Sequence, residues 1–185
     1  MVHLPGTGNA LRATAGAIAV AVVLACGAGS IRATPPIVPG SVASPREVNL
    51  IARDYAFVPD ALELVPGETV VLHVVNAGLV VHEAVIGDQS VQDAWEAAEA
   101  AVAGAPPGPT PVVSVAPALA GVRVVVRSGE RVDVTITVPA DAGTVEGSGG
   151  NGATGPVWLV GCHIPGHFAK GMQVPVRWLA PEPEA

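Results

Sequence analysis

RVDVTITV, residues 131–138, is the stretch that decides the fold class. Its apolar residues, Val132, Val134, Ile136 and Val138, alternate with charged or hydroxylated residues. Side chains of a β-strand point to opposite faces in turn, so this pattern predicts a strand with one buried and one solvated face. The chain also holds 22 Gly and 18 Pro, which favour turns, and its hydrophobic 50% is mostly Val and Ala. We therefore expect an all-β domain.

Two further strands are expected upstream. The first begins near Arg46, and a turn at Pro66–Gly67 precedes the second, which ends at the turn signal Asn76-Ala77-Gly78. The residues expected to face inward are Val48, Leu50 and Ala52 in the first strand and Val70, Leu72 and Val74 in the second. Short strands separated by turns in this way are typical of a Greek-key β-sandwich.

An insertion at about 88–118 interrupts the strand pattern. Residues 91–103 are rich in Ala and Glu, which favour a helix, and Ser90 is the expected N-cap. The prolines of 106–111 forbid continuation of that helix. The loop at 144–156 is Gly-rich, but its spacing fits no phosphate-binding signature, so we interpret it as a linker.

The N-terminal segment is interpreted as a leader. Residues 13–25 are apolar but too short to span a bilayer. Cys26, followed by small residues, resembles a bacterial lipoprotein box, so we expect residues 1–26 as the leader with lipidation at Cys26. Simple secretion or an uncleaved anchor are the alternatives. The expected remainder is a Pro/Ser/Ala-rich tether at 27–45, the folded domain at 46–180 and a tail at 181–185.

Each of these alternatives places the domain outside the cytoplasm of a bacterium. It would lie at the outer face of the cytoplasmic membrane, held by the N-terminal lipid anchor, or be free in the periplasm or secreted. The formal net charge of −7 and the absence of any basic run exclude binding to a nucleic-acid backbone.

The segment GCHIPGHFAKGM, residues 161–172, concentrates scarce metal-binding side chains. The chain has 2 Cys, and with Cys26 in the leader, Cys162 is an unpaired thiol in an oxidising compartment. His167 and Met172 follow it in a C-x4-H-x4-M pattern, and His82, shortly after a predicted strand, is the best candidate for a fourth donor. A thiolate, two imidazoles and a thioether are the donors of a blue copper site, whereas zinc has no use for the thioether.

The stretches 57–78, 81–83 and 162–172 together resemble a small cupredoxin of the plastocyanin and azurin kind. The resemblance covers roughly residues 47–87 and 121–179. It implies a Greek-key β-sandwich, here with an inserted α-helix, and one type 1 copper ion bound by His82, Cys162, His167 and Met172. His167 would lie nearest to solvent, within a collar of Ile164, Pro165 and Phe168.

Two features depart from the simplest relatives: the insertion, and the histidine that directly follows the cysteine. We hypothesise that Glu83 and His163, each next to a ligand, meet and brace the two loops. A multicopper oxidase or nitrite reductase needs further histidines, and the chain has 5. Its histidines are His3, His73, His82, His163 and His167. We therefore expect no enzyme.

The function that the sequence predicts is a membrane-tethered one-electron carrier. Its copper would cycle between Cu(I) and Cu(II), and redox partners, a cytochrome or an oxidase or reductase, would dock transiently near His167. The alternative is a protein that stores or delivers copper without redox turnover. Such sites often use Met-rich or His-rich runs, and this chain has 2 Met.

Overall fold

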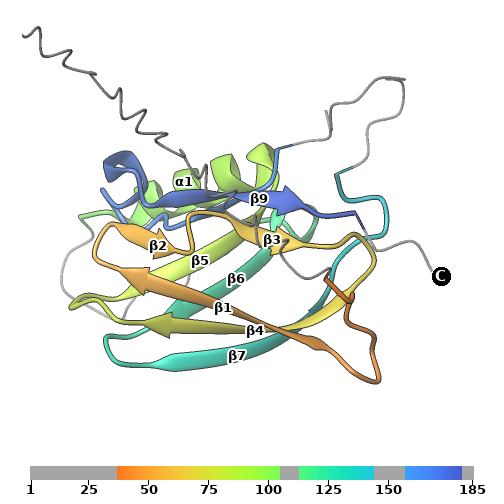
Figure 1. Ribbon diagram of the computed structural model, residues 1–185. Helices are drawn as coiled ribbons and strands as arrows, with labels where there is room; N and C mark the ends of the chain where they lie inside the picture. The colour runs from red at the N-terminus through yellow and green to blue at the C-terminus, as the bar shows by residue number, and fades with distance from the viewer. Residues whose placement is uncertain (1–36, 105–112, 144–156, 181–185) are drawn as a thin grey trace, which may run out of the picture. The chain divides into compact units, whose positions relative to one another are not determined.

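The computed structural model describes residues 37–104, 113–143 and 157–180 (Figure 1). The predicted leader, Cys26, the start of the tether, the Gly-rich loop and the tail lie outside the described residues. Within the described part, no helix combines the length and the apolar character that crossing a membrane requires.

Nine strands of the described chain form two sheets (Figure 1). The four-stranded sheet has the order β2-β1-β4-β7, with β1 and β4 parallel and the other pairs antiparallel. Its strands are β1 (Arg46–Arg53), β2 (Ala56–Val58), β4 (Thr69–Asn76) and β7 (Arg131–Thr137). The five-stranded sheet has the order β3-β9-β8-β5-β6. Its strands are β3 (Leu62–Leu64), β5 (His82–Gly87), β6 (Val122–Val126), β8 (Leu159–Gly161) and β9 (Gln173–Trp178).

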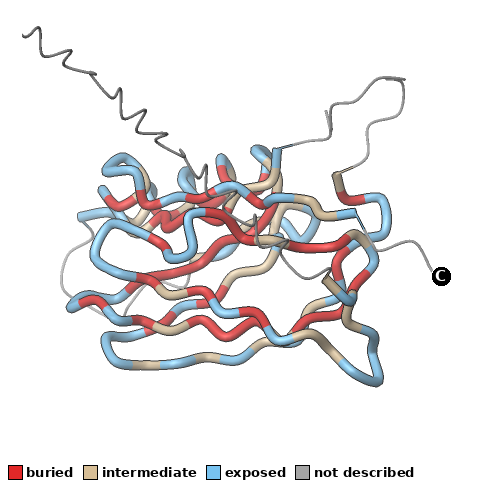
Figure 2. Tube along the Cα trace, in the orientation of Figure 1, coloured by how far each residue is buried: buried red, intermediate tan, exposed pale blue. Residues whose placement is uncertain are grey.

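The hydrophobic core lies between the two sheets, and Figure 2 shows the buried residues gathered along the strands that face it. All six residues predicted to face inward are buried, namely Val48, Leu50, Ala52, Val70, Leu72 and Val74. Strand β7 keeps the predicted alternation, but Val132, Val134 and Ile136 are only half-buried. The reason is that β7 is an edge strand, covered by a neighbour on one side alone.

The predicted helix is present as α1 (Gln89–Val102), but the predicted N-cap is wrong. Asp88, not Ser90, caps the helix: its carboxylate accepts the Val91 N–H at 3.1 Å. Ser90 lies within the first turn, and its hydroxyl donates to Asp88 at 2.6 Å. A carboxylate at this position satisfies an N–H that has no partner inside the helix.

Helix α1 packs on the outer face of the five-stranded sheet (Figure 1). Because both faces of β5 are covered, all six of its residues are buried. Ala84 and Ile86 face the core between the sheets, while Val85 packs against Val91 and Trp95 of the helix. The predicted β-sandwich with an inserted helix is confirmed.

Candidate metal centre

Two paired strands bring the distant parts of the centre together. His82 is the first residue of β5, and Cys162 directly follows β8. These strands pair antiparallel with Val85 opposite Gly161, so the start of one lies near the end of the other. The long separation in sequence between His82 and Cys162 therefore disappears in the folded sheet.

The ligand loop, residues 162–172, is closed by its own backbone hydrogen bonds. Cys162 N–H donates to the Met172 carbonyl at 3.1 Å, and Met172 N–H donates to the His167 carbonyl at 3.2 Å. Gly171 has a φ of 90°, a left-handed conformation that suits glycine and lets the chain turn back into β9. The backbone thus fixes the relative positions of the candidate ligands.

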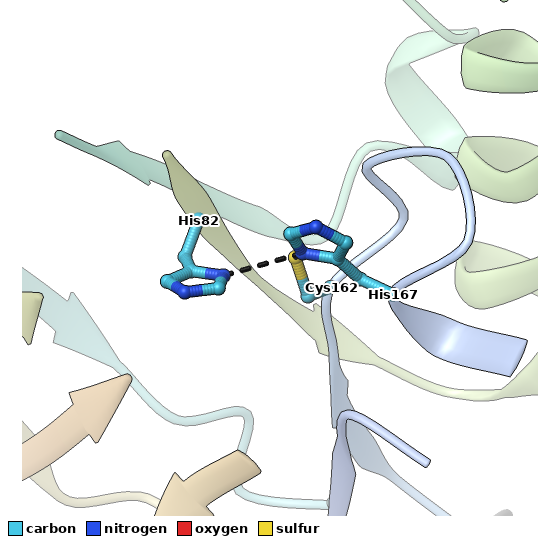
Figure 3. A group of neighbouring side chains, drawn as sticks. All are labelled: His82, Cys162 and His167. Atoms are coloured by element: carbon cyan, nitrogen blue, oxygen red, sulfur yellow. Dashed lines mark hydrogen bonds between the residues drawn. The ribbon is translucent and has the colours of Figure 1, made fainter. Parts of the chain in front are cut away.

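Three candidate donors converge in this loop and strand end (Figure 3). The Nδ1 atoms of His82 and His167 lie 3.2 Å apart, and Cys162 Sγ lies 3.3 Å from His167 Nδ1. All three donor atoms lie within 4.8 Å of one another. His82 and Cys162 are 0% exposed and His167 is 8% exposed, so His167 is the one nearest to solvent.

Met172, the fourth predicted ligand, is fully buried in the same loop. Its backbone bonds to both Cys162 and His167, as described above, which places the residue beside them. Its role as a copper ligand stays a prediction.

Asp54 contacts the other nitrogen of the His82 ring, a contact that sequence reasoning missed. His82 Nε2–H donates to Asp54 Oδ1 at 3.2 Å, which leaves Nδ1 free to face the other donors. The Leu79 N–H also donates to this oxygen, and together with His82 it holds the pKa of Asp54 below its ordinary value. A Cβ at Gly78 would lie 2.5 Å from the Asp54 carboxylate, so glycine makes room for the contact.

Tyr55 is a second residue at the site that sequence reasoning missed. It lies in the turn between β1 and β2 with a φ of 64°, which is uncommon for a residue with a bulky side chain. Its ring meets the His167 ring edge-on at 5.2 Å, and the ammonium group of Lys170 lies 3.9 Å from its centre. The turn that carries Tyr55 reaches His167 only in the folded protein, so no local sequence pattern predicts the contact.

Burial sets the protonation of two candidate ligands. It raises the pKa of the Cys162 thiol to about 11, and backbone hydrogen bonds from Glu83 and Ile164 only partly oppose the rise. Burial, together with the nearby His82 and Lys170, lowers the pKa of His167. At neutral pH the imidazole is therefore ready to bind a cation, whereas the thiol must lose its proton to do so.

Glu83 and His163 meet, but through the backbone of His163. Its N–H donates to Glu83 Oε1 at 3.0 Å, which joins the start of β5 to the ligand loop. The imidazole of His163 turns instead toward helix α1 and bonds to Gln92 and Glu96. The sequence did not predict this contact with the helix.

The donor set fits a type 1 copper centre. Two imidazole nitrogens and one thiolate, with a buried methionine in the same loop, are the residue types that such a centre uses. Zinc also accepts His and Cys, but a thioether would be of no use to it. The group formed by His82, Cys162 and His167 could hold one copper ion.

No family model matches the chain, and no curated protein matches it. Several solved structures do match the chain. A dithionite-reduced auracyanin from Roseiflexus castenholzii is 16% identical, over 72% of this chain and 96% of that one, with a TM-score of 0.49. Auracyanin A, a "blue" copper protein from Chloroflexus aurantiacus, is 20% identical, over 74% of this chain and 100% of that one, with a TM-score of 0.48. An azurin from Methylomonas sp. strain J is 17% identical, over 72% and 98%, with a TM-score of 0.48.

Proposed function

We propose that the protein is an extracytoplasmic type 1 copper protein that carries one electron at a time. The observation that supports this most is the buried convergence of one sulfur and two ring nitrogens within 4.8 Å. A copper ion bound there would supply the redox chemistry by cycling between Cu(I) and Cu(II).

The residues of the chain have separable tasks in this proposal. Cys162 would supply the thiolate, His82 and His167 would supply the imidazoles, and Met172 would supply a thioether that tunes the potential of the ion. Asp54 fixes the His82 ring so that Nδ1 faces the centre. Burial of the donors keeps water away, so their arrangement changes little when an electron enters or leaves.

An apolar surface next to His167 supports transient docking of a redox partner protein. Leu79 is 85% exposed, and Val80, Val81 and Tyr55 are also exposed. Leu79 bonds to Asp54 and Tyr55 contacts His167, so this surface adjoins the centre. Small apolar surfaces of this kind suit the brief contacts of electron transfer.

The three residues of the expected collar, Ile164, Pro165 and Phe168, differ in their exposure. Pro165 is exposed, but Phe168 is half-buried and stacks on the His163 ring, with centroids 4.7 Å apart. The ring that meets His167 edge-on is that of Tyr55, from the turn before β2. We therefore propose that a partner would touch Tyr55 and residues 79–81 first.

We further propose that the carrier is tethered by a lipid on Cys26 to the outer face of the cytoplasmic membrane, and that it is not an enzyme. The proposal rests on the sequence of the leader and on the few histidines of the chain. Mass spectrometry of the protein from bacterial membranes would find a lipidated Cys26 at the mature N-terminus. An unmodified, secreted chain would contradict the tether.

Electron exchange separates this proposal from storage or delivery of copper. Voltammetry of the copper-loaded protein should give a reversible one-electron wave, and a reduced cytochrome should reduce the protein rapidly. The Cys162→Ser variant should lose the wave. A protein that binds copper but releases it on reduction, or exchanges electrons slowly, would instead be a storage or delivery protein.

A further inference from the structure

Helix α1 turns one polar face toward residues that flank the candidate ligands. Gln92, Glu96 and Glu99 are spaced so that they lie on the same side of a helix. Gln92 and Glu99 are buried although both are polar, so their partners matter for the stability of the fold. One partner of Gln92 is His163, which follows Cys162. The partner of Glu99 is Arg123, which also bonds to Glu83 beside His82.

The imidazole of His163 is the main link between the helix and the ligand loop. It is buried, with Nδ1 hydrogen-bonded to Glu96 Oε2 at 2.7 Å and Nε2 hydrogen-bonded to Gln92 Oε1 at 2.7 Å. Its ring also stacks on Phe168 at 4.7 Å, with the planes 21° apart. His163 follows Cys162 and Phe168 follows His167, so one side chain connects the neighbours of two candidate ligands to the helix.

Gln92 extends this link to the strands. Its amide Nε2 lies 3.2 Å from the carbonyl of Val85 in β5 and 3.1 Å from that of Leu159 in β8. These are the strands that begin at His82 and end before Cys162. A Cβ at Gly161 would lie 2.5 Å from Gln92 Oε1, so the bare glycine is what lets this amide approach.

A second link runs through Glu83 and Arg123. Glu83 accepts the His163 N–H with one oxygen and the Arg123 Nε–H with the other, at 3.0 and 2.7 Å. Arg123 also donates to Glu99 of the helix at 2.7 Å, and its guanidinium lies 4.4 Å from the centre of the Trp95 ring. Both carboxylates thus share one cation, and the helix is attached to the loop at two points.

We propose that His163 is a positioning residue through which helix α1 fixes the ligand loop, and so sets the geometry of Cys162 and His167. Side chains that hydrogen-bond to a metal ligand, or pack against it, determine how the ligand is oriented and how far it can move. The inserted helix then has a structural role at the metal centre. The predicted change in the copper site rests on the proposed function, but the predicted fixing of the ligand loop by the helix does not.

Two variants weaken the link, and a third is the control. Glu96→Gln removes the charged acceptor of His163 Nδ1 at a side chain that is 51% exposed, so the fold should tolerate it. Gln92→Met removes the amide while keeping a similar length. Asp93→Asn changes the charge of the same helix at an exposed residue whose carboxylate bonds to Gln89.

The first measurement is amide hydrogen exchange over residues 163–172 in the metal-free protein. Losing a hydrogen bond to a charged or buried partner should speed exchange there about tenfold in both link variants, and not in the control. The second is the visible absorption band and the reduction potential of the copper-loaded protein, which should shift in the same two variants.

The outcomes are distinguishable. Folded link variants whose loop exchange, band and potential all match those of Asp93→Asn would overturn the proposal. If the unaltered protein shows no thiolate–copper band, the proposed function fails, and loop exchange in the metal-free protein still decides whether the helix holds the loop. Should Gln92→Met fail to fold, Glu96→Gln decides alone.

Discussion

The contact between Asp54 and His82 gives a single carboxylate direct influence on the metal centre. Asp54 Oδ1 accepts the His82 Nε2–H at 3.2 Å, and hydrogen bonds from Leu79 and His82 keep the pKa of Asp54 low. The carboxylate is therefore charged at neutral pH. A negative charge at this distance stabilises the more positive oxidation state of an ion bound at Nδ1.

We accordingly expect Asp54→Asn to raise the reduction potential of the copper-loaded protein. The rise should be on the order of tens of millivolts, since a tenfold change in a one-electron equilibrium corresponds to about 59 mV. Voltammetry measures it. Asp60→Asn is the matched control, because Asp60 lines a groove with Arg46 and Glu47 at the other end of β1. Equal potentials in the two variants would show that Asp54 does not act on the centre.

The Cys162 thiol makes the stability of the metal-free protein depend on pH. Its pKa is raised from 9.0 to about 11 by burial, so the folded state holds this proton more tightly than the unfolded state. The resulting stability is present below pH 9 and is lost as the pH rises toward 11. A shift of this size corresponds to roughly 2–3 kcal/mol.

Urea unfolding of the metal-free protein between pH 8 and about 11 tests this linkage. The free energy of unfolding should fall more steeply with pH in the unaltered protein than in Cys162→Ala, which has no thiol to ionise. Parallel curves for the two proteins would contradict the raised pKa.

At the scale of elements, the N-cap of α1 provides a direct comparison of two neighbouring side chains. Asp88 accepts the Val91 N–H, while the Ser90 hydroxyl only donates to Asp88. Asp88→Ala should lower the free energy of unfolding by about 1 kcal/mol, as expected for loss of an N-cap. Ser90→Ala should cost clearly less. Equal losses of the free energy of unfolding would contradict a dominant role of Asp88 in capping.

The sequence predicts the strands whose two faces differ and misses those whose faces are alike. In β1 and β4 the inward positions alternate, and they are buried where predicted. The residues of β5 show no alternation between apolar and polar side chains. The four-stranded sheet covers one face of this strand and α1 covers the other, so all its residues are buried. Its burial depends on a helix that folds back from later in the chain, which no local pattern reveals.

The same limit applies to the metal centre. Cys162, His167 and Met172 could be predicted together because a single loop carries them in a recognisable spacing. His82 was predicted from its place shortly after a predicted strand, and the family resemblance points to the same residue. Asp54, Tyr55 and the contact of His163 with Gln92 could not be predicted, because each joins segments that only the folded sheets bring together.

At the scale of the whole molecule, apolar side chains from both sheets make up most of the core, and the candidate ligands Cys162 and Met172 belong to the same cluster. Buried side chains such as Leu50, Leu72 and Ile86 pack between the two sheets and need no metal to do so. We therefore expect the protein to stay folded when copper is removed by a chelator. Copper should then raise the melting temperature, because it binds the folded state alone.

Circular dichroism of the protein with and without copper tests this expectation. The β-sheet signal should be the same in both states, and only the melting temperature should change. Loss of the signal on chelation would mean that the metal organises the whole fold, as it does in small metal-dependent domains.

The most direct test of the central claim is a titration of the metal-free protein with Cu(II), followed by visible absorption. If Cys162, His82 and His167 bind one ion together, an intense thiolate–copper band should grow and stop at one equivalent. The band should be absent in Cys162→Ser. A colourless Cu(II) complex, or a band that persists without the thiol, would contradict a copper centre at these residues.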